Sequence, residues 1–504
     1  MLSNYFELNE ITASEFNVLQ SLDKQGQTDV AISLAKKMLN KYPMSAALYN
    51  FLGVVNSNIG KHANALLYFK KTIELSPDFS DAHNNLGVNY LALGDYLNAR
   101  QCFETAITLE PNNARFHYNI SKPLYANSEH KSAIEHLKRA IRLRDNYLVA
   151  MNDLGNCMMM SGKVQESISI YKNVLTKDPT FTEAYGNLGI AYSKLGNLEA
   201  AKTNYLKALE LDPNCNATKL NLVGLLKMLG ENNKPAHTLI QLDSDLKKIG
   251  KTIIYSATDA FLTEKVDQMF SMLDFTQLNL TNNISQLFKS SDHDLNCNRH
   301  LKLFEEMKVI PEYCFGCFKV QVEVNSVLDL IRLASLFYSI RFSEDLTTKC
   351  MIETRDTASG FYKGFIYCSS LKQATTVKTT LERARRNLEW MSAIKIKHGC
   401  TEYTSEYPEF EVSENTDTQM QYPVHWKTIE SEFDEQFSIY PEQNKLPSYV
   451  NFCLSDILVI ERWIDYAKGI GDKSVNKLSD RALKYRDTFD LAHNRLQKFS
   501  TCSV

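Results

Sequence analysis

The sequence predicts an α-helical solenoid followed by an α+β domain with flanking helices, in one chain of 504 residues. Three observations support this fold class. Prolines in the first half recur with a period of about 34 residues, which is typical of helical repeats. Small and aromatic residues repeat in register with these prolines. After Pro311 the spacing of apolar residues changes from helical to alternating, so the chain joins a repetitive part to a part of different architecture.

The first half is built on positions that recur with this one period. One of them ends a helix, because proline cannot continue it. Proline stands there at Pro43, Pro77, Pro111, Pro179 and Pro213, and Asp145 fills the remaining position. Other positions alternate small residues, which let two helices approach closely, with larger ones that fill the space between units. These positions hold Leu52-Gly53, Leu86-Gly87, Leu154-Gly155 and Leu188-Gly189; Ala31, Ala65, Ala99, Ala133 and Ala201; and Phe69, Phe103, Leu137, Tyr171 and Tyr205.

This pattern resembles the tetratricopeptide repeat (TPR), a helix–turn–helix unit of about 34 residues. The resemblance implies a superhelix of five full units from about Ala46 to Asn214, preceded by a weaker unit from about Thr12. A seventh unit begins at Asn216 and loses the pattern at Pro235, so we expect it to form a cap. The TPR solenoid is accordingly predicted to span residues 1–234.

In the TPR family the first helices of the units line a concave groove that holds an extended peptide, so the resemblance implies a protein or peptide partner. A polar side chain recurs just before the Leu-Gly position, where it can pair with the main chain of such a peptide. These candidate peptide-binding residues are Asn85, Asn119, Asp153, Asn187 and Asn221. The same side chains can instead bond between neighbouring units, and the sequence leaves both possibilities open.

The second half predicts the element order β-α-β-β-α-β, which is that of the ferredoxin-like sandwich. Apolar residues alternate in the strands and follow a helical period in the two longer segments between them. The predicted strands are 318–324, 348–354, 361–367 and 393–397, and the predicted helices are 326–340 and 370–388. We therefore expect a cysteine-rich α+β domain at 297–400, a helical connector at 235–296, and an acidic loop segment with closing helices at 401–504.

Cysteine is concentrated in this second half, where seven of the 11 cysteines lie between Cys297 and Cys453. Without an export signal they should be thiols, and clustered thiols point to a metal or redox centre. Cys297-x2-His300 followed by Cys314-x2-Cys317 has the spacing of two ligand pairs in a structural zinc site. Zinc is therefore the expected cofactor, and these four residues are its expected ligands.

A second ligand set follows from the predicted topology. The strand order 4-1-3-2 brings the start of the first strand to the same end of the sheet as the ends of the third and fourth strands. Cys314, Cys317, Cys368 and Cys400 would then converge, and they could hold an iron–sulfur cluster, the alternative cofactor. Reduced structural thiols without a metal are the simplest alternative to both sets.

The composition limits the partners that this chain can have. Apolar residues make up 44% of the chain and charged residues 23%, which excludes a long disordered protein. The net charge of −3 argues against a nucleic-acid partner held by bulk electrostatics. The sequence has no apolar run long enough to span a membrane, and its first residues lack the apolar core of an export signal. We therefore expect a cytoplasmic protein without a membrane partner.

These features favour a protein–protein interaction scaffold that binds a partner peptide in the TPR groove and carries a zinc-stabilised α+β module of unknown activity. One alternative is an enzyme, a transferase or a redox protein, whose groove recruits a protein substrate. Another is RNA binding, because Lys363–Tyr367 partly resembles the RNP1 strand of an RNA-recognition motif, with Phe365 and Tyr367 placed to stack bases. We predict no catalytic residues, since a TPR alone says little about chemistry.

Overall fold

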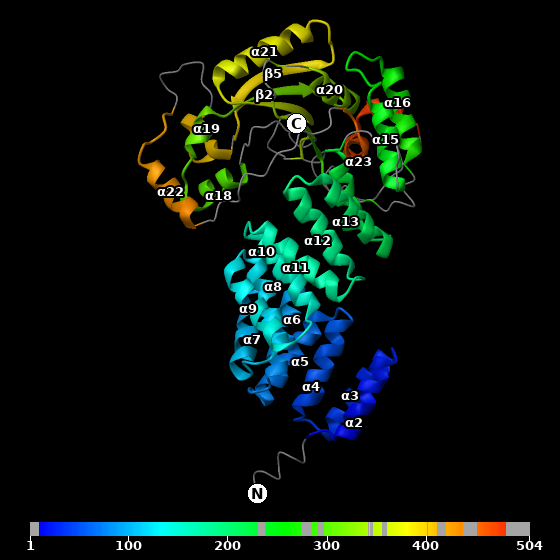
Figure 1. Ribbon diagram of the computed structural model, residues 1–504, viewed down its shortest axis with the longest axis vertical. Coiled ribbons are helices and arrows are strands. Elements are labelled where there is room, and N and C mark those ends of the chain that lie inside the picture. The colour runs from blue at the N-terminus through cyan, green and yellow to red at the C-terminus, as the bar shows by residue number, and fades with distance from the viewer. Residues whose placement is uncertain are drawn as a thin grey trace, which may run out of the picture. The chain divides into compact units, whose positions relative to one another are not determined.

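The computed structural model describes residues 10–229, 237–273, 280, 284–289, 297–340, 342, 346–354, 360–400, 402–410, 420–436 and 451–479 (Figure 1). The chain divides into two compact units, Met1–Ala191 and Tyr192–Val504. The domain boundaries that we predicted at residues 234, 296 and 400 stay predictions. Pro235 and Cys502 lie outside the described residues, as does most of the second predicted closing helix.

The first unit is a series of antiparallel helix pairs that follow one another along the chain (Figure 1). The turn inside a pair needs one residue in the left-handed conformation, which favours glycine because it has no Cβ. Gly60 and Gly94 both have φ 75° in these turns, whereas Ser128 takes φ 63° in the next one. The helices are α2 Ala13–Lys24, α3 Thr28–Lys41, α4 Ala46–Asn58, α5 His62–Leu75, α6 Ser80–Ala92, α7 Tyr96–Leu109, α8 Ala114–Ala126, α9 His130–Leu143, α10 Leu148–Met160 and α11 Val164–Lys177, and α12 Thr182–Lys194 crosses the division.

The recurrent small and aromatic residues of the sequence meet inside these pairs, as their spacing predicts. A Cβ added to Gly87 would lie 2.7 Å from the ring of Phe103, so only glycine lets the two helices of this pair approach so closely. Phe69, which faces the equivalent glycine one pair earlier, also packs in one cluster with Leu86 of the following pair. The aromatic residue therefore fills space both inside its own unit and toward the next.

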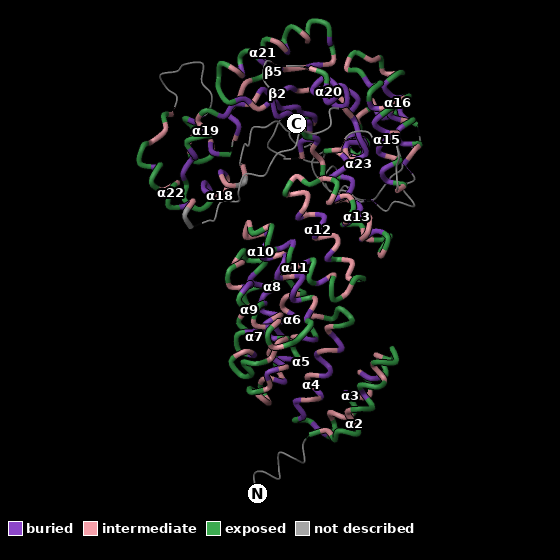
Figure 2. Tube along the Cα trace, viewed as in Figure 1, coloured by how far each residue is buried: buried purple, intermediate pink, exposed green. Residues whose placement is uncertain are grey.

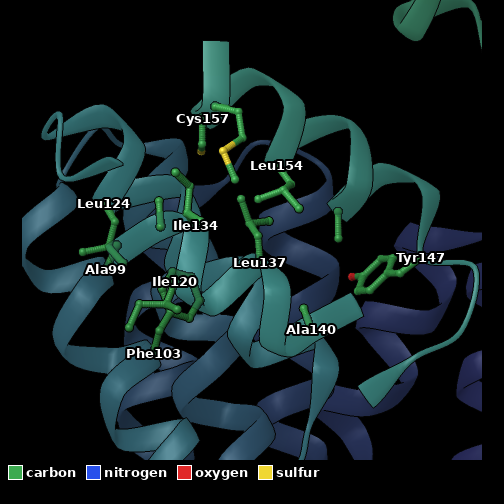
Figure 3. Packing of buried hydrophobic residues seen from close by; sticks show 13 residues of the cluster. Ala99, Phe103, Ile120, Leu124, Ile134, Leu137, Ala140, Tyr147, Leu154 and Cys157 are labelled. Carbon is green, nitrogen blue, oxygen red and sulfur yellow. The ribbon is translucent and has the colours of Figure 1, made fainter. Parts of the chain in front are cut away.

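The apolar core runs from one pair into the next. Each helix of this unit combines buried residues with intermediate or exposed ones, and α4 and α10 are buried along most of their length (Figure 2). One cluster draws side chains from the four consecutive helices α7 to α10, which belong to three successive pairs, so the apolar core is continuous from pair to pair (Figure 3). Its labelled members are Ala99, Phe103, Ile120, Leu124, Ile134, Leu137, Ala140, Tyr147, Leu154 and Cys157. A continuous core of this kind is what nearest-neighbour stacking in a solenoid requires.

The second unit combines helices with a small antiparallel sheet of five strands. Its helices are α13 Leu198–Leu211, α14 Asn216–Leu226, α15 Thr238–Gly250, α16 Asp259–Met272, α18 Cys297–Met307, α19 Glu312–Gly316, α20 Val327–Ser339, α21 Leu371–Arg385, α22 Trp426–Gln436 and α23 Leu454–Gly469. Its strands are β1 Gln286–Lys289, β2 Phe318–Val324, β3 Thr348–Ile352, β4 Tyr362–Cys368 and β5 Met391–His398, and the short 3₁₀ segments are η1 Glu402–Ser405, η2 Pro408–Phe410 and η4 Lys473–Lys477.

All four predicted strands and both predicted helices between them are present, with ends shifted by a few residues. The strand order is β1-β3-β4-β2-β5, so β2, β3, β4 and β5 stand in the order predicted for the four strands. Helix α20 packs on β3 and β4, and α21 on β2 and β5. Ser326 caps α20, because its hydroxyl accepts a hydrogen bond from the backbone N–H of Asp329.

The connector at 235–296 differs from the prediction, because it is not purely helical. After α15 and α16, residues 286–289 form β1, which pairs antiparallel with β3 at the edge of the sheet. Its four residues are too few to show an alternating pattern in the sequence. The sheet therefore has one strand more than the predicted four.

Buried charges join α14 to the helices that follow it. The Lys247 ammonium donates to the carbonyl oxygens of Leu226 and Leu229 at 2.7 and 2.6 Å, so it caps the C-terminal end of α14. Lys227 pairs with the buried carboxylate of Asp456 on α23 at 2.7 Å. The end of α14 is therefore stabilised by α15 and α23.

Candidate functional site

The amides of the predicted peptide-binding residues bond from one repeat to the one before it. In three of these residues, the side-chain Nδ2 donates to the Oδ1 of an asparagine in the preceding repeat. We call this series of bonds the amide ladder. The pairs are Asn85–Asn50 at 3.2 Å, Asn119–Asn84 at 2.8 Å and Asn187–Asn152 at 2.9 Å. The structure thus places three of the five predicted residues in an inter-repeat ladder, which is the second of the two roles that the sequence allowed.

Asp153 continues the ladder with a different partner. Its carboxylate hydrogen-bonds the hydroxyl of Tyr118, which stands at the same offset in the preceding repeat as the asparagine acceptors. Burial raises the pKa of Asp153, and the bond from Tyr118 opposes that shift. Asn221 lies on α14 and is half-buried. The sequence analysis missed the acceptors of the ladder, although a second recurrent asparagine one position earlier was the visible signal.

The ladder amides are less exposed than a free binding surface would be. Asn119 is 6% exposed and its acceptor Asn84 is 2% exposed, whereas Asn85 and Asn187 are half-buried. An asparagine offers two N–H donors and one oxygen with two lone pairs, and each inter-repeat bond uses one donor. Asn85 and Asn187 therefore retain donor and acceptor capacity for a ligand.

Three segments of the second unit bring four cysteines together. Cys297 begins α18, Cys314 lies in α19, Cys317 directly precedes β2, and Cys400 follows β5. The backbone N–H of residue 399 donates to the carbonyl oxygen of Cys317 at 2.9 Å, which continues the pairing of β2 with β5. Cys400 lies near Cys297 and Cys314, as the mutual effects of these thiols on their pKa values indicate. We call these four residues the thiol cluster.

Glycine at position 399 makes room for this arrangement. A Cβ added there would overlap Cys317 Sγ, at a separation that real Cβ atoms do not show. The Cys317 sulfur therefore lies against the backbone that leads into Cys400. Close by, the Tyr403 hydroxyl is 3.6 Å from Cys314 Sγ, and the Lys319 ammonium donates to the carbonyl oxygen of residue 399 at 2.8 Å.

Ionisation within the thiol cluster is strongly coupled. The pKa of Cys400 is lowered to about 3 because its thiolate accepts hydrogen bonds from Cys297 and Cys314, and Lys319 adds to the effect. The pKa values of Cys297 and Cys314 are raised above their usual range, first because each donates to Cys400 and second because each is buried. Burial, followed by the charge of Cys400, raises the pKa of Cys317 to about 12. The charge of Cys400 therefore opposes ionisation of the other three thiols.

The thiol cluster contains members of both predicted ligand sets. It takes Cys297, Cys314 and Cys317 from the first set and Cys400 from the second. His300 is buried, and its ring stacks on Tyr313 with centroids 5.4 Å apart. Cys297 and His300 lie one turn apart on α18. Both predicted ligand sets stay predictions.

The remaining cysteine of the second set lies within the sheet. Cys368 ends β4 opposite Phe318, and its thiol donates to the carbonyl oxygen of Ile366 at 3.9 Å. Among the described residues, no group of three or more His, Cys, Asp or Glu side chains stands ready to hold a metal ion as the side chains are placed.

The surface proposed for RNA stacking is occupied by the protein itself. Phe365 is 6% exposed, and the Lys319 ammonium lies 5.4 Å from the centroid of its ring. Lys363 on the same strand is buried and pairs with the buried carboxylate of Glu353 at 3.1 Å. A base could not stack on Phe365 without displacing these contacts.

The stacked helix pairs and their continuous core define the N-terminal part of the chain as a helical-repeat solenoid. The tetratricopeptide repeat family matches residues 19–78, 80–113 and 182–215. These residues therefore form TPRs, as the sequence pattern indicated. In the part of the chain that the structure describes, no helix has the length and apolar character needed to cross a membrane.

Solved structures similar to this chain cover only its N-terminal part. YrrB, described as a TPR protein with an unusual peptide-binding site, is 25% identical, with 36% of this chain and 95% of that chain covered and a TM-score of 0.32. A MamA protein is 26% identical, with 33% and 92% covered and a TM-score of 0.31. TTC0263, a thermophilic TPR protein from Thermus thermophilus, is 22% identical, with 36% and 99% covered and a TM-score of 0.32. No curated protein matches the chain.

Proposed function

We propose that the chain is a protein-interaction scaffold whose TPR region binds an extended peptide segment of a partner protein. TPRs support an interaction scaffold in general, and the amide ladder supports the more specific proposal. Its bonds repeat at a constant interval in the sequence, so they hold successive helices in a constant register. A constant register presents polar groups at regular intervals, which suits the regular main chain of an extended peptide.

The ladder would contribute affinity, while sequence choice would depend on other side chains. Beyond the inter-repeat bond, Asn85 and Asn187 each keep one N–H and at least one lone pair of the amide oxygen, which in Asn85 also accepts a long hydrogen bond from Asn84 at 3.4 Å, and both are half-buried. These groups could pair with the backbone N–H and C=O of a bound peptide. A ligand held mainly through its main chain should tolerate many side-chain changes but not the loss of its backbone donors.

Binding to synthetic peptides tests this proposal. Peptides selected from a random extended library against the full chain should lose at least about tenfold in affinity, or about 1.4 kcal/mol, when alternate backbone amides are N-methylated. The double variant Asn85→Ala/Asn187→Ala should bind the unmodified peptides more weakly. Gln101→Ala, an exposed change on α7, is the control and should bind normally. Equal affinity for methylated and unmodified peptides would refute main-chain recognition.

We also propose that β2, α20, β3, β4, α21 and β5 form a ferredoxin-like sandwich to which β1 adds an edge strand. The element order and the antiparallel strand order support this assignment. The module would give the scaffold a second folded surface beside the repeats. Circular dichroism of a variant with Leu287→Pro, which should remove β1 alone, would test whether the other strands persist without it.

A further inference from the structure

We infer that the helix pair α8–α9 is a pH-sensitive joint of the solenoid, which a hydrogen bond between His117 and His136 closes and which opens when both rings are protonated. We call these two residues the histidine pair. The inference rests on the geometry of the histidine pair and on the irregular backbone of the two helices that carry it. It does not depend on peptide binding by the repeats.

The histidine pair joins its two helices through one shared proton. The Nδ1 atoms of His117 on α8 and His136 on α9 are 3.0 Å apart, and the stacked rings have centroids 5.2 Å apart. Nitrogens at this distance need one proton between them, because two bare nitrogens or two N–H groups would repel each other. His117 is 8% exposed and His136 is half-buried, so the bond is largely shielded from water.

The second nitrogen of His117 determines which ring donates. His117 Nε2 is 2.9 Å from the carbonyl oxygen of Pro111, and a carbonyl oxygen can only accept. Neutral His117 therefore carries its proton on Nε2, and its bare Nδ1 accepts. His136 must donate from Nδ1, which leaves its own Nε2 bare. One repeat earlier, His83 Nε2 lies 2.9 Å from the carbonyl oxygen of Pro77, so the bond to a proline carbonyl recurs in two successive repeats.

This arrangement makes the two rings respond differently to acid. A first proton on His136 Nε2 leaves the Nδ1–H donor in place, so the bond between the rings survives. A second proton can bind only to His117 Nδ1. Two N–H groups and two positive charges would then face each other at the 3.0 Å separation of the two Nδ1 atoms, and their repulsion opens the joint.

The surroundings of the histidine pair favour its uncharged form. Burial, followed by the charge of His117, lowers the pKa of His136, and Arg100 of α7 acts in the same direction. Glu135 of α9 and Glu104 of α7 oppose this shift but do not reverse it. His136 therefore binds its proton less readily in the closed joint than it would in water.

The other helices around the pair hold groups whose charge changes little near neutral pH. Helix α10 meets α9 through the shared apolar cluster, which includes Cys157, and burial raises the pKa of that thiol to about 12. Arg115 on α8 pairs with Asp81 of α6. Residues 114–147 carry seven Lys and Arg against three Asp and Glu, so further protons enter a repeat that is already positive.

A third histidine lies on α9 without joining the two helices by a hydrogen bond. His130 begins α9, and its buried Nδ1 meets no hydrogen-bond partner among the described residues. Its ring lies near Tyr125 of α8, with centroids 5.4 Å apart, and burial lowers its pKa. It can add to a loss of stability in acid, so the test must separate it from the histidine pair.

The backbone of α8 and α9 is weaker than that of the neighbouring helix pairs. Pro123 lies inside α8, and because proline has no N–H, the helical hydrogen bond to the Asn119 carbonyl is missing. The turn between the helices holds Ser128 at φ 63°, a conformation that a Cβ disfavours. The equivalent turns hold glycine at φ 75–77°, at Gly26, Gly60, Gly94, Gly162 and Gly196. A locally weak helix pair can open without unfolding of the whole solenoid.

Opening of α8–α9 also affects the amide ladder. Asn119 lies two residues after His117 on α8 and donates to Asn84 of the preceding repeat. Displacement of α8 breaks this bond, so acid interrupts the ladder in the middle of the repeats. If the groove holds a peptide, this interruption weakens its binding, and that one consequence rests on the proposed function.

Hydrogen exchange of the full chain, followed by mass spectrometry at about pH 7.5 and about pH 5, tests the inference without a substitution. The open joint binds up to two more protons than the closed one, and each changes the opening constant by up to about tenfold per pH unit below about 6.5. After correction for the pH dependence of unstructured peptides, exchange of residues 114–147 should rise at least about tenfold. Exchange of residues 80–113 should rise less than about threefold, and an equal rise in both segments would overturn the inference.

Matched substitutions identify the responsible rings. His117→Gln and His136→Gln each leave a single histidine, so the rise in residues 114–147 should be at least about threefold smaller than in the parent chain. His83→Gln removes the equivalent bond to a proline carbonyl outside the pair, and His130→Gln removes the third histidine; both should keep the rise. The inference is overturned if His117→Gln and His136→Gln keep the full rise, or if His83→Gln or His130→Gln abolishes it instead.

Discussion

The bond between Asn119 and Asn84 provides a direct measure of how much the amide ladder stabilises the solenoid. The Asn119 amide donates to Asn84 Oδ1 at 2.8 Å, and both side chains are buried. Asn119→Ala removes the donor and leaves a buried oxygen without a partner, which costs about 1–3 kcal/mol. The higher helix propensity of alanine offsets at most about 0.7 kcal/mol of this cost. We therefore expect the free energy of unfolding of the repeats to fall by about 1–2 kcal/mol.

The two units can be followed separately during urea unfolding of the full chain. The three tryptophans are Trp390, Trp426 and Trp463, all in the second unit, so tryptophan fluorescence reports on that unit. A loss of helical circular dichroism without a fluorescence change then reports on the first. Asn119→Ala should shift the dichroism transition to lower urea and leave the fluorescence transition in place. Gln101→Ala, an exposed change on α7, should stay within about 0.5 kcal/mol of the parent protein.

A double-mutant cycle isolates the bond from other effects of the substitution. Asn84→Ala and the double variant complete the cycle, and residues that share a hydrogen bond typically show a coupling of about 0.5–3 kcal/mol. If the two single changes simply add, the bond contributes no net stability, and the explanation of the ladder as an inter-repeat fastener is wrong. A measured coupling would also mean that reduced partner binding by Asn119→Ala cannot by itself be assigned to the groove.

Three further predictions concern packing, charge and pH. Gly87→Ala should destabilise the repeats by about 1–3 kcal/mol through overlap with the facing ring, whereas Gly224→Ala, with open space around it, should stabilise its helix by up to about 1 kcal/mol. Asp456→Asn should cost about 3–5 kcal/mol in the fluorescence transition, because it leaves Lys227 buried without its counter-charge. Burial and a neighbouring histidine lower the pKa of His136 in the folded protein. Its contribution to the free energy of unfolding is therefore fully present above the pKa of the unfolded chain, near 6.5, and is lost as pH falls through the lower pKa of the folded protein. His136→Gln should flatten this part of the pH–stability curve.

The repeats could be predicted because each recurrent residue has the same steric role in every helix pair. The overlap that a Cβ at Gly87 would make with Phe103 is such a role, and it leaves a trace at a fixed sequence spacing. The ladder was harder to predict, because its bonds join residues whose separation is one position longer than the repeat. Only the alignment of neighbouring helices shows that Asn119 meets Asn84 and not Asn85.

The second unit was predictable where periodicity is strong and unpredictable where elements are short. The order of β2 to β5 followed from alternating apolar residues, whereas β1 has too few residues to alternate. Each member of the thiol cluster was predicted, but no single sequence signal covered all four. Local spacing indicated Cys297, and sheet topology indicated Cys400, so the two residues belonged to different predicted ligand sets. The pKa of Cys400 responds to Cys297 and Cys314, so members of the two sets lie near one another.

The end of the solenoid leads to a last prediction, because α14 is stabilised by residues far beyond it. Lys247 caps the carbonyl groups at the end of α14, and the apolar side chains of Leu222 and Leu226 are buried. If the seventh unit is a self-sufficient cap, a fragment ending near Ile240 should fold as an independent helical array. The structure alters this expectation, since that fragment keeps α14 but lacks both Lys247 and α23.

We therefore expect a fragment of residues 1–240 to associate or to bind a hydrophobic dye, because the apolar side of α14 has lost its cover. A fragment of residues 1–214, which ends before α14, should associate less and bind less dye than the 1–240 fragment. In the full chain, Lys247→Met should destabilise the second unit, because it leaves the two carbonyl groups and the Asp243 carboxylate without their donor. If the 1–240 fragment is monomeric and melts cooperatively, α14 needs no cover from the second unit. The seventh repeat would then be a self-sufficient cap, as its sequence first suggested.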